Sequence, residues 1–371
     1  SPNIQLLNQE MKIKNMASSN WIIPILSIFL LLGVVLASLF MQPRASSEAW
    51  DIQESDFPAN GSSEEKLTFL LRYAILAPSS HNTQPWRFDV NDSEIKVFAD
   101  KNRWLSVADA DQRELYISVG CALENLLVAA EHFGYGFNVT YFPENGDAVA
   151  LVKFNPDSSS SHQDPRLFQS ILTRHTNRMP YESKEDLEGA LLMLRNYSTE
   201  QGIQLYLTSD PRIKNTFREL VVDADQIQYS DVDYKSELGH WIGQGVMGPT
   251  GVNAIIDQMK VVLLDVGKDQ TKKDADLVNS TPVLGFVISK ENDRESQVRS
   301  GQTFERLWLE ATALGISIHP MSQALEVPGK KEALTKLIVG SGLYLQQAFR
   351  LGYAEPLKEH TPRRPMEDFL T

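Results

Sequence analysis

The chain has very little cysteine and no cluster of metal-ligating residues. Its 371 residues include one cysteine, Cys121, which excludes an intrachain disulfide and a cysteine-rich metal site. The seven histidines show no spacing typical of metal ligands. Cys121 falls on the apolar side of an expected helix, which favours a small buried residue over a redox role. The sequence therefore predicts no metal site.

The chain also has fewer basic than acidic residues. Lys and Arg number 35 against 48 Asp and Glu, which gives a formal net charge of −13, and the basic residues are scattered apart from a few short clusters. This balance argues against nucleic acid as a partner. With 42% hydrophobic and 22% charged residues, the chain has a globular composition and can hold one large domain or two smaller ones.

A long apolar run lies near the N-terminus. Residues 21–41 carry no charge and match the roughly 20 residues that cross a bilayer as a helix. Lysines precede the run and Arg44 is the nearest basic residue after it, which favours a globular part outside the cytoplasm. We expect a single N-terminal transmembrane anchor. The alternative is a signal peptide cleaved near the small residues 45–47, which would leave a secreted or periplasmic protein.

The remaining chain divides at polar, turn-rich segments. Helical spacing over 67–76 and 112–133 predicts two helices, and strands are expected over 95–99, 137–142 and 148–154. The expected organisation is a tail (1–20), the apolar segment (21–41), a flexible tether rich in Ser, Pro, Asp and Glu (42–63), a first half (64–157), a serine-rich linker (158–163) and a second half (164–371).

The second half repeats the first in outline. Gly120 and Gly301 open similar helical stretches, and the same offset of 181 residues relates Gly134 to Gly315. Each copy is a helix that ends at glycine and is followed by a strand-like segment. The agreement of spacing and context predicts an internal duplication.

A polar loop over 77–88 follows the first expected helix. Pro78 and Pro85 stop that helix because proline fixes φ and restricts the residue before it. The side chains between them offer hydrogen-bond donors and acceptors without charge, which suits the edge of a neutral heteroaromatic ring better than a metal or a phosphate. An ordinary turn is the alternative interpretation. The residues concerned are Pro78, Ser79, Ser80, Asn82 and Gln84.

Arginines gather at two places in the second half. Arg174, Thr176 and Arg178 form an Arg-x-Thr-x-Arg motif, which is followed by Pro180. Arg363 and Arg364 lie together near the C-terminus. A planar guanidinium pairs with phosphate oxygens in a bidentate manner, and a nearby hydroxyl completes an anion pocket. The alternative is two surface arginines at a helix end.

These motifs together resemble those of the FMN-dependent nitroreductase superfamily. The segments that carry the resemblance are Ala-Pro-Ser-Ser-His-Asn-Thr-Gln-Pro-Trp-Arg-Phe (77–88), Arg-His-Thr-Asn-Arg (174–178), Gly-x-x-x-Glu-Arg-Leu-Trp-Leu-Glu-Ala (301–311), Arg-Leu-Gly-Tyr-Ala (350–354) and Arg-Arg-Pro (363–365). The arrangement of two halves in one chain is similar to the Acg-type FMN-binding proteins. The resemblance covers roughly residues 64–371 and implies an α+β nitroreductase-like fold, with two pseudo-symmetric halves that mimic the family's homodimer.

The resemblance also implies where FMN binds. In ordinary members the arginine motif and C-terminal basic residues of one subunit hold the phosphate, and the Pro-Ser-x-x-Asn loop comes from the other subunit. Here each half has only part of this set, so we expect one FMN per chain, between the halves. The implied contacts are Arg174, Thr176, Asn177, Arg178, Arg363 and Arg364 from the second half, Pro78, Ser79, Ser80, Asn82 and Gln84 from the first, and Met321 and Ser322 beside the reactive edge of the ring.

The implied activity is hydride transfer from NADPH or NADH, through FMN, to a small-molecule acceptor such as a nitroaromatic or a quinone. No side chain is expected as a general acid or base, because the chemistry belongs to the flavin. The alternative is a protein that binds or sequesters FMN with little turnover. The globular part is expected to be self-sufficient as a monomer.

Three further segments lie outside these motifs. Residues 243–248 fit Gly-x-Gly-x-x-Gly but follow no convincing strand, so we expect a flexible lid or loop and no dinucleotide fold; in the sequestering alternative, the segment around 243–251 covers the site. Arg113 either lies near the site or forms an ion pair at a helix start. Lys272, Lys273 and residues 274–276 are expected to be solvated surface.

Overall fold

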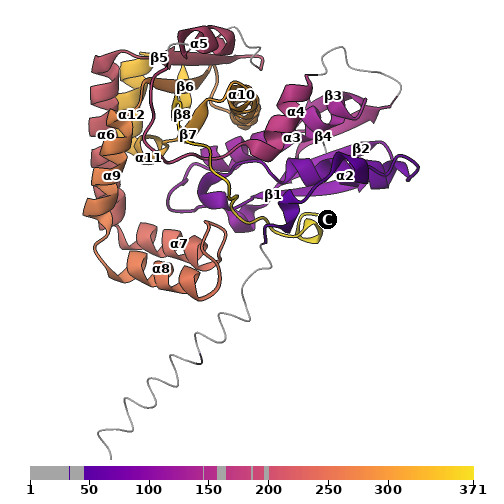
Figure 1. The fold of residues 1–371 in the computed structure, drawn as a ribbon, viewed down its shortest axis with the longest axis horizontal. Coiled ribbons are helices and arrows are strands. Elements are labelled where there is room, and N and C mark those ends of the chain that lie inside the picture. Colours follow the sequence, from indigo (N-terminus) through magenta and orange to yellow (C-terminus); the bar gives the residue numbers. More distant parts are fainter. Residues whose placement is uncertain (1–32, 34–45, 145, 157–163, 185–186, 196–199) are drawn as a thin grey trace, which may run out of the picture.

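The computed structural model describes residues 33, 46–144, 146–156, 164–184, 187–195 and 200–371. These residues form two four-stranded antiparallel sheets with helices packed around them (Figure 1). The α+β class expected from the sequence is confirmed.

The first sheet has the strand order β1-β2-β4-β3. Its neighbouring strands are all antiparallel. The helix before it, α2, begins with a capping box in which the Ser62 side chain and the Glu65 carboxylate each accept the other's backbone N–H, at 3.1 and 2.7 Å. The elements are α2 (Ser63–Ala74), β1 (Trp86–Asn91), β2 (Glu94–Ala99), α3 (Arg113–His132), β3 (Gly136–Tyr141) and β4 (Ala148–Asn155), with short 3₁₀ turns η1 (Glu48–Trp50), η2 (Glu54–Asp56), η3 (Ser80–Asn82) and η4 (Lys101–Arg103).

The second sheet repeats this pattern, with the order β5-β6-β8-β7. Its strands are β5 (Ile203–Thr208), β6 (Val283–Ser289), β7 (Ser317–Pro320) and β8 (Tyr344–Gly352). Its helices are α4 (Pro165–Thr173), α5 (Leu187–Arg195), α6 (Pro211–Ser230), α7 (Val232–Gly243), α8 (Gly251–Leu263), α9 (Gly267–Asn279), α10 (Arg294–Ala313), α11 (Gln323–Glu326) and α12 (Pro328–Ile338), and η5 (Met366–Asp368) follows. In both sheets the fourth strand in sequence lies between the second and third.

Helices α3 and α10 pack against each other at two glycines. A Cβ on Gly120 would lie 2.1 Å from the Val298 carbonyl oxygen, and a Cβ on Gly301 would lie 2.0 Å from that of Ile117. The two backbones therefore approach more closely than any side chain permits, which offsets the roughly 1 kcal/mol by which glycine weakens a helix. The 181-residue offset noted in the sequence relates both members of this contact, Gly120 to Gly301 and Ile117 to Val298.

The C-terminal segment pairs with the first half at two places. Ser46 and Arg363 exchange backbone hydrogen bonds of 2.9 Å, and the Phe88 N–H of β1 donates to the Phe369 carbonyl at 2.7 Å. Figure 1 shows the C-terminus against the first half. Of the flexible tether predicted over 42–63, residues 46–63 are described, and two of them contact the rest of the protein: Ile52 is buried, and the Trp50 indole donates to the Thr361 carbonyl at 3.0 Å.

None of the helices within the described residues is long and apolar enough to cross a membrane. The apolar segment 21–41 falls outside those residues except for Gly33. The membrane anchor therefore stays a prediction.

Candidate functional site

The polar loop after α2 has an unusual backbone. His81, Asn82 and Gln84 all have positive φ, at 48°, 50° and 52°. Non-glycine residues in this region cost of order 1–3 kcal/mol each and persist where surrounding contacts hold them, often at functional sites. One such contact is the Ser79 hydroxyl, which accepts the Gln84 N–H at 2.9 Å. Pro78, next to it, is half-buried.

The loop side chains contact three separate parts of the chain. The Ser80 hydroxyl donates to the Glu114 carboxylate at the start of α3. The Asn82 amide donates to the Val246 carbonyl at 2.6 Å and to the Pro362 carbonyl at 3.0 Å. Gln84 accepts the Arg364 N–H at 2.9 Å. The loop thus joins the first half to the α7–α8 connection and to the C-terminal segment.

Two of the predicted phosphate ligands instead bind the end of α2. Arg174 and Arg363 both donate to the Leu76 carbonyl, at 3.1 and 2.9 Å, and Arg363 also donates to Ile75 and Ala77. These carbonyls lie at a helix C-terminus, where backbone acceptors lack partners. Arg174 also forms a buried ion pair with Glu305, at 3.2 Å. Both guanidiniums are therefore committed to the protein.

Burial and like charge perturb the groups around this helix end. Burial and the neighbouring Arg174 lower the pKa of Arg363 to about 9. Burial also raises the pKa of Glu305 to about 7, although Arg174 opposes that rise. Arg364, one residue on, donates to the Asp368 carbonyl at 2.9 Å and packs over the Phe369 ring at 4.6 Å. This cluster fastens the second half to the first.

Truncating Arg363 tests this structural role. We expect Arg363→Ala to destabilise the chain by about 3 kcal/mol or more, because the carbonyls of Ile75 and Ala77 would lose their arginine donor and Leu76 would keep only Arg174. Urea unfolding without flavin measures the effect. The matched control is Arg212→Ala, since the Arg212 side chain is 91% exposed and its ion pair with Asp210 lies at the surface. Equal unfolding midpoints for the two variants would contradict the assignment.

The residues after Arg174 differ in how they are used. Thr176 is half-buried and forms a backbone bridge with Ile318 of β7. The Asn177 side chain is satisfied by the protein, donating to the Glu355 carbonyl at 2.9 Å and accepting the Met179 N–H at 3.0 Å. Within the described part of the chain, the Arg178 guanidinium forms no hydrogen bond or ion pair, and its side chain is exposed.

Arg178 nevertheless lies in a protein-rich environment. Burial lowers its pKa, while the charge of Asp274 opposes that shift. Burial is the main cause that lowers the pKa of His81 in the polar loop and of His319 in β7, and the charge of Arg178 lowers both further. The positive charge of Arg178 therefore acts on both the first-half loop and the β7 end of the second sheet, and no ion pair holds it within the described residues.

The segment after β7 presents few free groups. Met321 is fully buried, and its N–H donates to the Ala348 carbonyl at 2.9 Å, so that amide is not available to a ligand. Ser322 is half-buried, and its hydroxyl accepts from the Gln347 amide at 3.4 Å. Gln323 follows, with its amide donating to Asp274 at 3.3 Å.

Asp274 and Asp225 form a buried pair that the sequence did not reveal. Asp274 is 4% exposed, so the expectation of solvated surface was wrong for it, while Asp276 on the same helix pairs with Lys272 in solvent. The sequence signal that could have revealed this burial is helical spacing, because Asp274 lies three and four residues before the apolar Leu277 and Val278 and so shares their helix face. Burial, followed by the charge of Asp274, raises the pKa of Asp225 to about 8.

This pair predicts a pH dependence of stability. An aspartate in the unfolded chain loses its proton near pH 4, whereas Asp225 holds its proton to about pH 8 in the folded protein. The folded state thus binds more protons over that window, so stability falls as pH rises through it. We expect Asp225→Asn to reduce this slope by up to about 1 kcal/mol per pH unit. Urea unfolding midpoints between pH 5 and 8 measure this slope. The control Asp276→Asn should leave the slope unchanged. An unaltered slope in Asp225→Asn would contradict the account.

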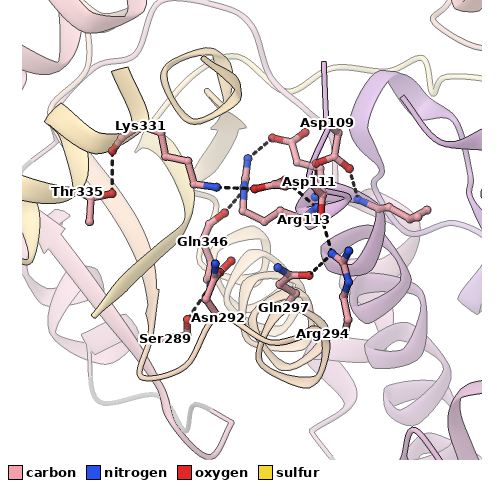
Figure 2. A network of polar contacts seen from close by, with 12 residues as sticks. Asp109, Asp111, Arg113, Ser289, Asn292, Arg294, Gln297, Lys331, Thr335 and Gln346 are labelled. Atoms are coloured by element: carbon pink, nitrogen blue, oxygen red, sulfur yellow. Dashed lines mark hydrogen bonds and ion pairs between the residues drawn. The ribbon is translucent and has the colours of Figure 1, made fainter. Parts of the chain in front are cut away.

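Arg113 is part of a polar network between the halves (Figure 2). It is 1% exposed, pairs with Glu114 at 2.8 Å and donates to the Gln346 carbonyl of β8. Lys331 of α12 pairs with Asp111 at 2.7 Å beside it. The ion pair expected at the start of α3 is confirmed, and its partner Glu114 also accepts from Ser80 of the polar loop; proximity of Arg113 to a flavin stays a prediction.

A cavity of about 490 Å³ adjoins this network. It lies between the loop before α3 and helices α11 and α12, with Arg113 and Glu326 in its lining. Burial, with the charge of Glu114, raises the pKa of Asp109 at its edge to about 7. No group of residues able to hold a metal ion occurs in the described ranges.

The α7–α8 connection covers the polar loop. Val246 is fully buried in a cluster with Leu105, Ala108 and Trp241. The Glu237 carboxylate of α7 accepts the N–H groups of residues 107 and 108, at 3.0 and 2.9 Å. The α7–α8 connection is therefore docked on the first half through Val246, while residues 248–250 are exposed.

Several curated proteins similar to this chain are named as nitroreductases, and no family model matches it. A "Putative NAD(P)H nitroreductase" of Mycobacterium tuberculosis (strain ATCC 25618 / H37Rv) is 28% identical over 321 residues, covering 82% of this chain and 91% of the relative. From the same strain, "Putative NAD(P)H nitroreductase acg" is 25% identical over 313 residues, covering 80% and 93%. The "Probable NAD(P)H nitroreductase PigM" of Serratia sp. (strain ATCC 39006) is 24% identical, covering 84% and 95%.

Solved structures give weaker matches. The FMN-dependent nitroreductase NfnB from Mycobacterium smegmatis in complex with NADPH aligns with 14% identity and a TM-score of 0.33, over 52% of this chain and 88% of that one. A nitroreductase with bound FMN from Desulfitobacterium hafniense DCB-2 aligns with 14% identity and a TM-score of 0.35, over 56% and 97%. The recognition made from the sequence motifs is confirmed by the curated proteins: this chain is a relative of proteins named NAD(P)H nitroreductases, Acg among them.

Proposed function

We propose that the protein is an FMN-dependent oxidoreductase that transfers hydride from NADPH or NADH to a nitroaromatic, quinone or similar small acceptor. The observation that carries the proposal is the convergence of three segments far apart in sequence. Asn82 of the polar loop binds Pro362 of the tail, and Arg174 and Arg363 share one carbonyl of the first half. These are the segments that the family resemblance assigns to the two sides of one flavin.

The residues present fit a phosphorylated flavin. Arg178 supplies a guanidinium without a protein partner in the described part of the chain, and Thr176, two residues earlier, supplies a hydroxyl. These two side chains would bind the phosphate. Arg174, Arg363 and Arg364 would not contact the phosphate directly, because their donors bind protein carbonyls. They would hold in place the segments that form the site. The polar loop (78–84) and the segment from Pro320 to Gln323 would contact the ring, and the bound FMN supplies the hydride chemistry.

Anaerobic mixing tests the proposal. The FMN-loaded protein is mixed with NADPH and, separately, NADH while the flavin absorbance is followed. Rapid bleaching by one donor supports the proposal, and reoxidation by a nitroaromatic or a quinone identifies the acceptor class. Flavin that stays oxidised with both donors would overturn the reductase assignment.

The docked α7–α8 connection favours a second candidate function. Val246 is fully buried on the first half, and the Asn82 side chain is already bonded to it. A covered site would bind or sequester FMN with little turnover. In the mixing experiment this protein would retain FMN and show no bleaching, whereas an Asn82→Ala variant with a loosened connection would bleach.

We also propose that residues 21–41 anchor the chain in a membrane, with the globular part outside the cytoplasm. Support comes from the length and lack of charge of this segment. Co-flotation of the full chain with phosphatidylcholine vesicles at high salt is the expected result. Recovery of the chain in the soluble fraction, with a new N-terminus near residues 45–47, would instead identify a cleaved signal peptide.

A further inference from the structure

Helix α8 carries an apolar stripe that faces away from the rest of the described protein. Val252, Ile256, Met259 and Leu263 recur at helical spacing and are 49%, 44%, 45% and 68% exposed. The opposite face is occupied, since Ala254 is fully buried. Figure 1 shows α7 and α8 as a pair at one end of the molecule, with α8 outermost in that view. Contiguous apolar exposure of this kind marks an interaction surface.

The connection that leads into α8 is linked by hydrogen bonds to the chain around Ser46. The Val246 and Pro362 carbonyl oxygens bind the same Asn82 nitrogen, at 2.6 and 3.0 Å. Pro362 precedes Arg363, which pairs with Ser46 through two backbone hydrogen bonds of 2.9 Å. Val246 lies in the connection that leads into α8 at Gly251. Short covalent and hydrogen-bonded steps therefore connect Ser46 to the start of α8.

The length of chain before Ser46 limits how far a bilayer can be. The apolar segment ends at Met41, and the residues from there to Ser46 span at most about 17 Å when extended. If residues 21–41 cross a membrane, the surface of that membrane lies within this distance of Ser46. Five residues, at most about 18 Å of extended chain, separate Val246 from the start of α8, so this helix can approach the same surface.

We propose that the apolar stripe of α8 docks on the lipid bilayer in which the chain is anchored. The proposal rests on the membrane anchor proposed above. Helix α8 contains one basic residue, Lys260, paired with Asp257 at 2.7 Å, so the binding is apolar and depends little on salt or on anionic lipid. Docking would couple the membrane to the connection that covers the polar loop.

A depth measurement on the full chain tests this surface. Because Cys121 is buried and no other cysteine exists, Ile256→Cys places a single accessible thiol on the stripe for an environment-sensitive fluorophore. Leu192→Cys, on α5 and 60% exposed, is the matched control. The chain is reconstituted in phosphatidylcholine vesicles whose acyl chains carry a nitroxide quencher. We expect the label at position 256 to lose most of its emission and the label at position 192 to lose little.

Flotation of the same samples separates the two proposals. If the chain floats with the vesicles but the label at position 256 is not quenched, the anchor is supported and the docking proposal is overturned. This outcome would also be seen if a second copy of the chain or residues 21–41 covered the stripe. If the chain does not float, the anchor fails and the docking proposal fails with it. A further Met259→Glu substitution should restore emission at position 256 while flotation persists.

Discussion

Gly120→Ala and Gly301→Ala are each expected to destabilise the protein by about 3 kcal/mol or more. In either variant the new Cβ would lie about 2 Å from a backbone carbonyl oxygen of the facing helix, which cannot move without separating α3 from α10. Because this contact joins the two halves, the loss falls on the whole fold. Urea unfolding followed by circular dichroism measures the change.

Gly329→Ala provides the matched control for these substitutions. Gly329 also lies in a helix, α12, but a Cβ added there would have no described neighbouring atom within 4 Å. Alanine at this position should be neutral or stabilising by up to about 1 kcal/mol, because it has the higher helix propensity. Stabilities for Gly120→Ala or Gly301→Ala equal to that of Gly329→Ala would refute the close helix contact.

Arg178→Ala is expected to weaken FMN binding by about 100-fold, the loss of a charge-assisted bidentate interaction with the phosphate. The apoprotein should unfold at the same urea concentration as before, since Arg178 has no hydrogen bond or ion pair in the described part of the chain. Quenching of FMN fluorescence on titration measures the affinity.

Two controls separate a phosphate contact from general electrostatics. Arg178→Lys keeps the charge but loses the planar fork, so we expect an intermediate affinity. Arg212→Ala removes a surface charge and should leave the affinity unchanged. Wild-type affinity in Arg178→Ala would exclude this guanidinium as the phosphate ligand.

The elements with strong local signals were predictable from the sequence. Helix α3 and strands β2, β3 and β4 lie where hydrophobic periodicity placed them. Pro78 likewise indicated the end of α2 and the polar loop after it. These features depend on residues near one another in the chain, where propensity and turn chemistry decide the structure.

The use of each arginine was not predictable. Arg174 and Arg363 have the residue type that binds phosphate, yet they bind carbonyls at the end of α2. The Leu76 carbonyl lies 98 residues from Arg174 and 287 residues from Arg363 in the chain. Which of several arginines stays free depends on tertiary contacts that no local pattern encodes. The same holds for Asp225 and Asp274, whose mutual burial requires α6 and α9 to pack together.

The amount of FMN bound per chain tests the central claim most directly. The purified chain is saturated with FMN and freed of unbound flavin, and the visible absorbance is compared with the protein concentration. One site between the two halves predicts one FMN per chain. A ratio of two would mean that the pseudo-symmetric second site is intact, and a colourless protein that retains no added FMN would contradict the account.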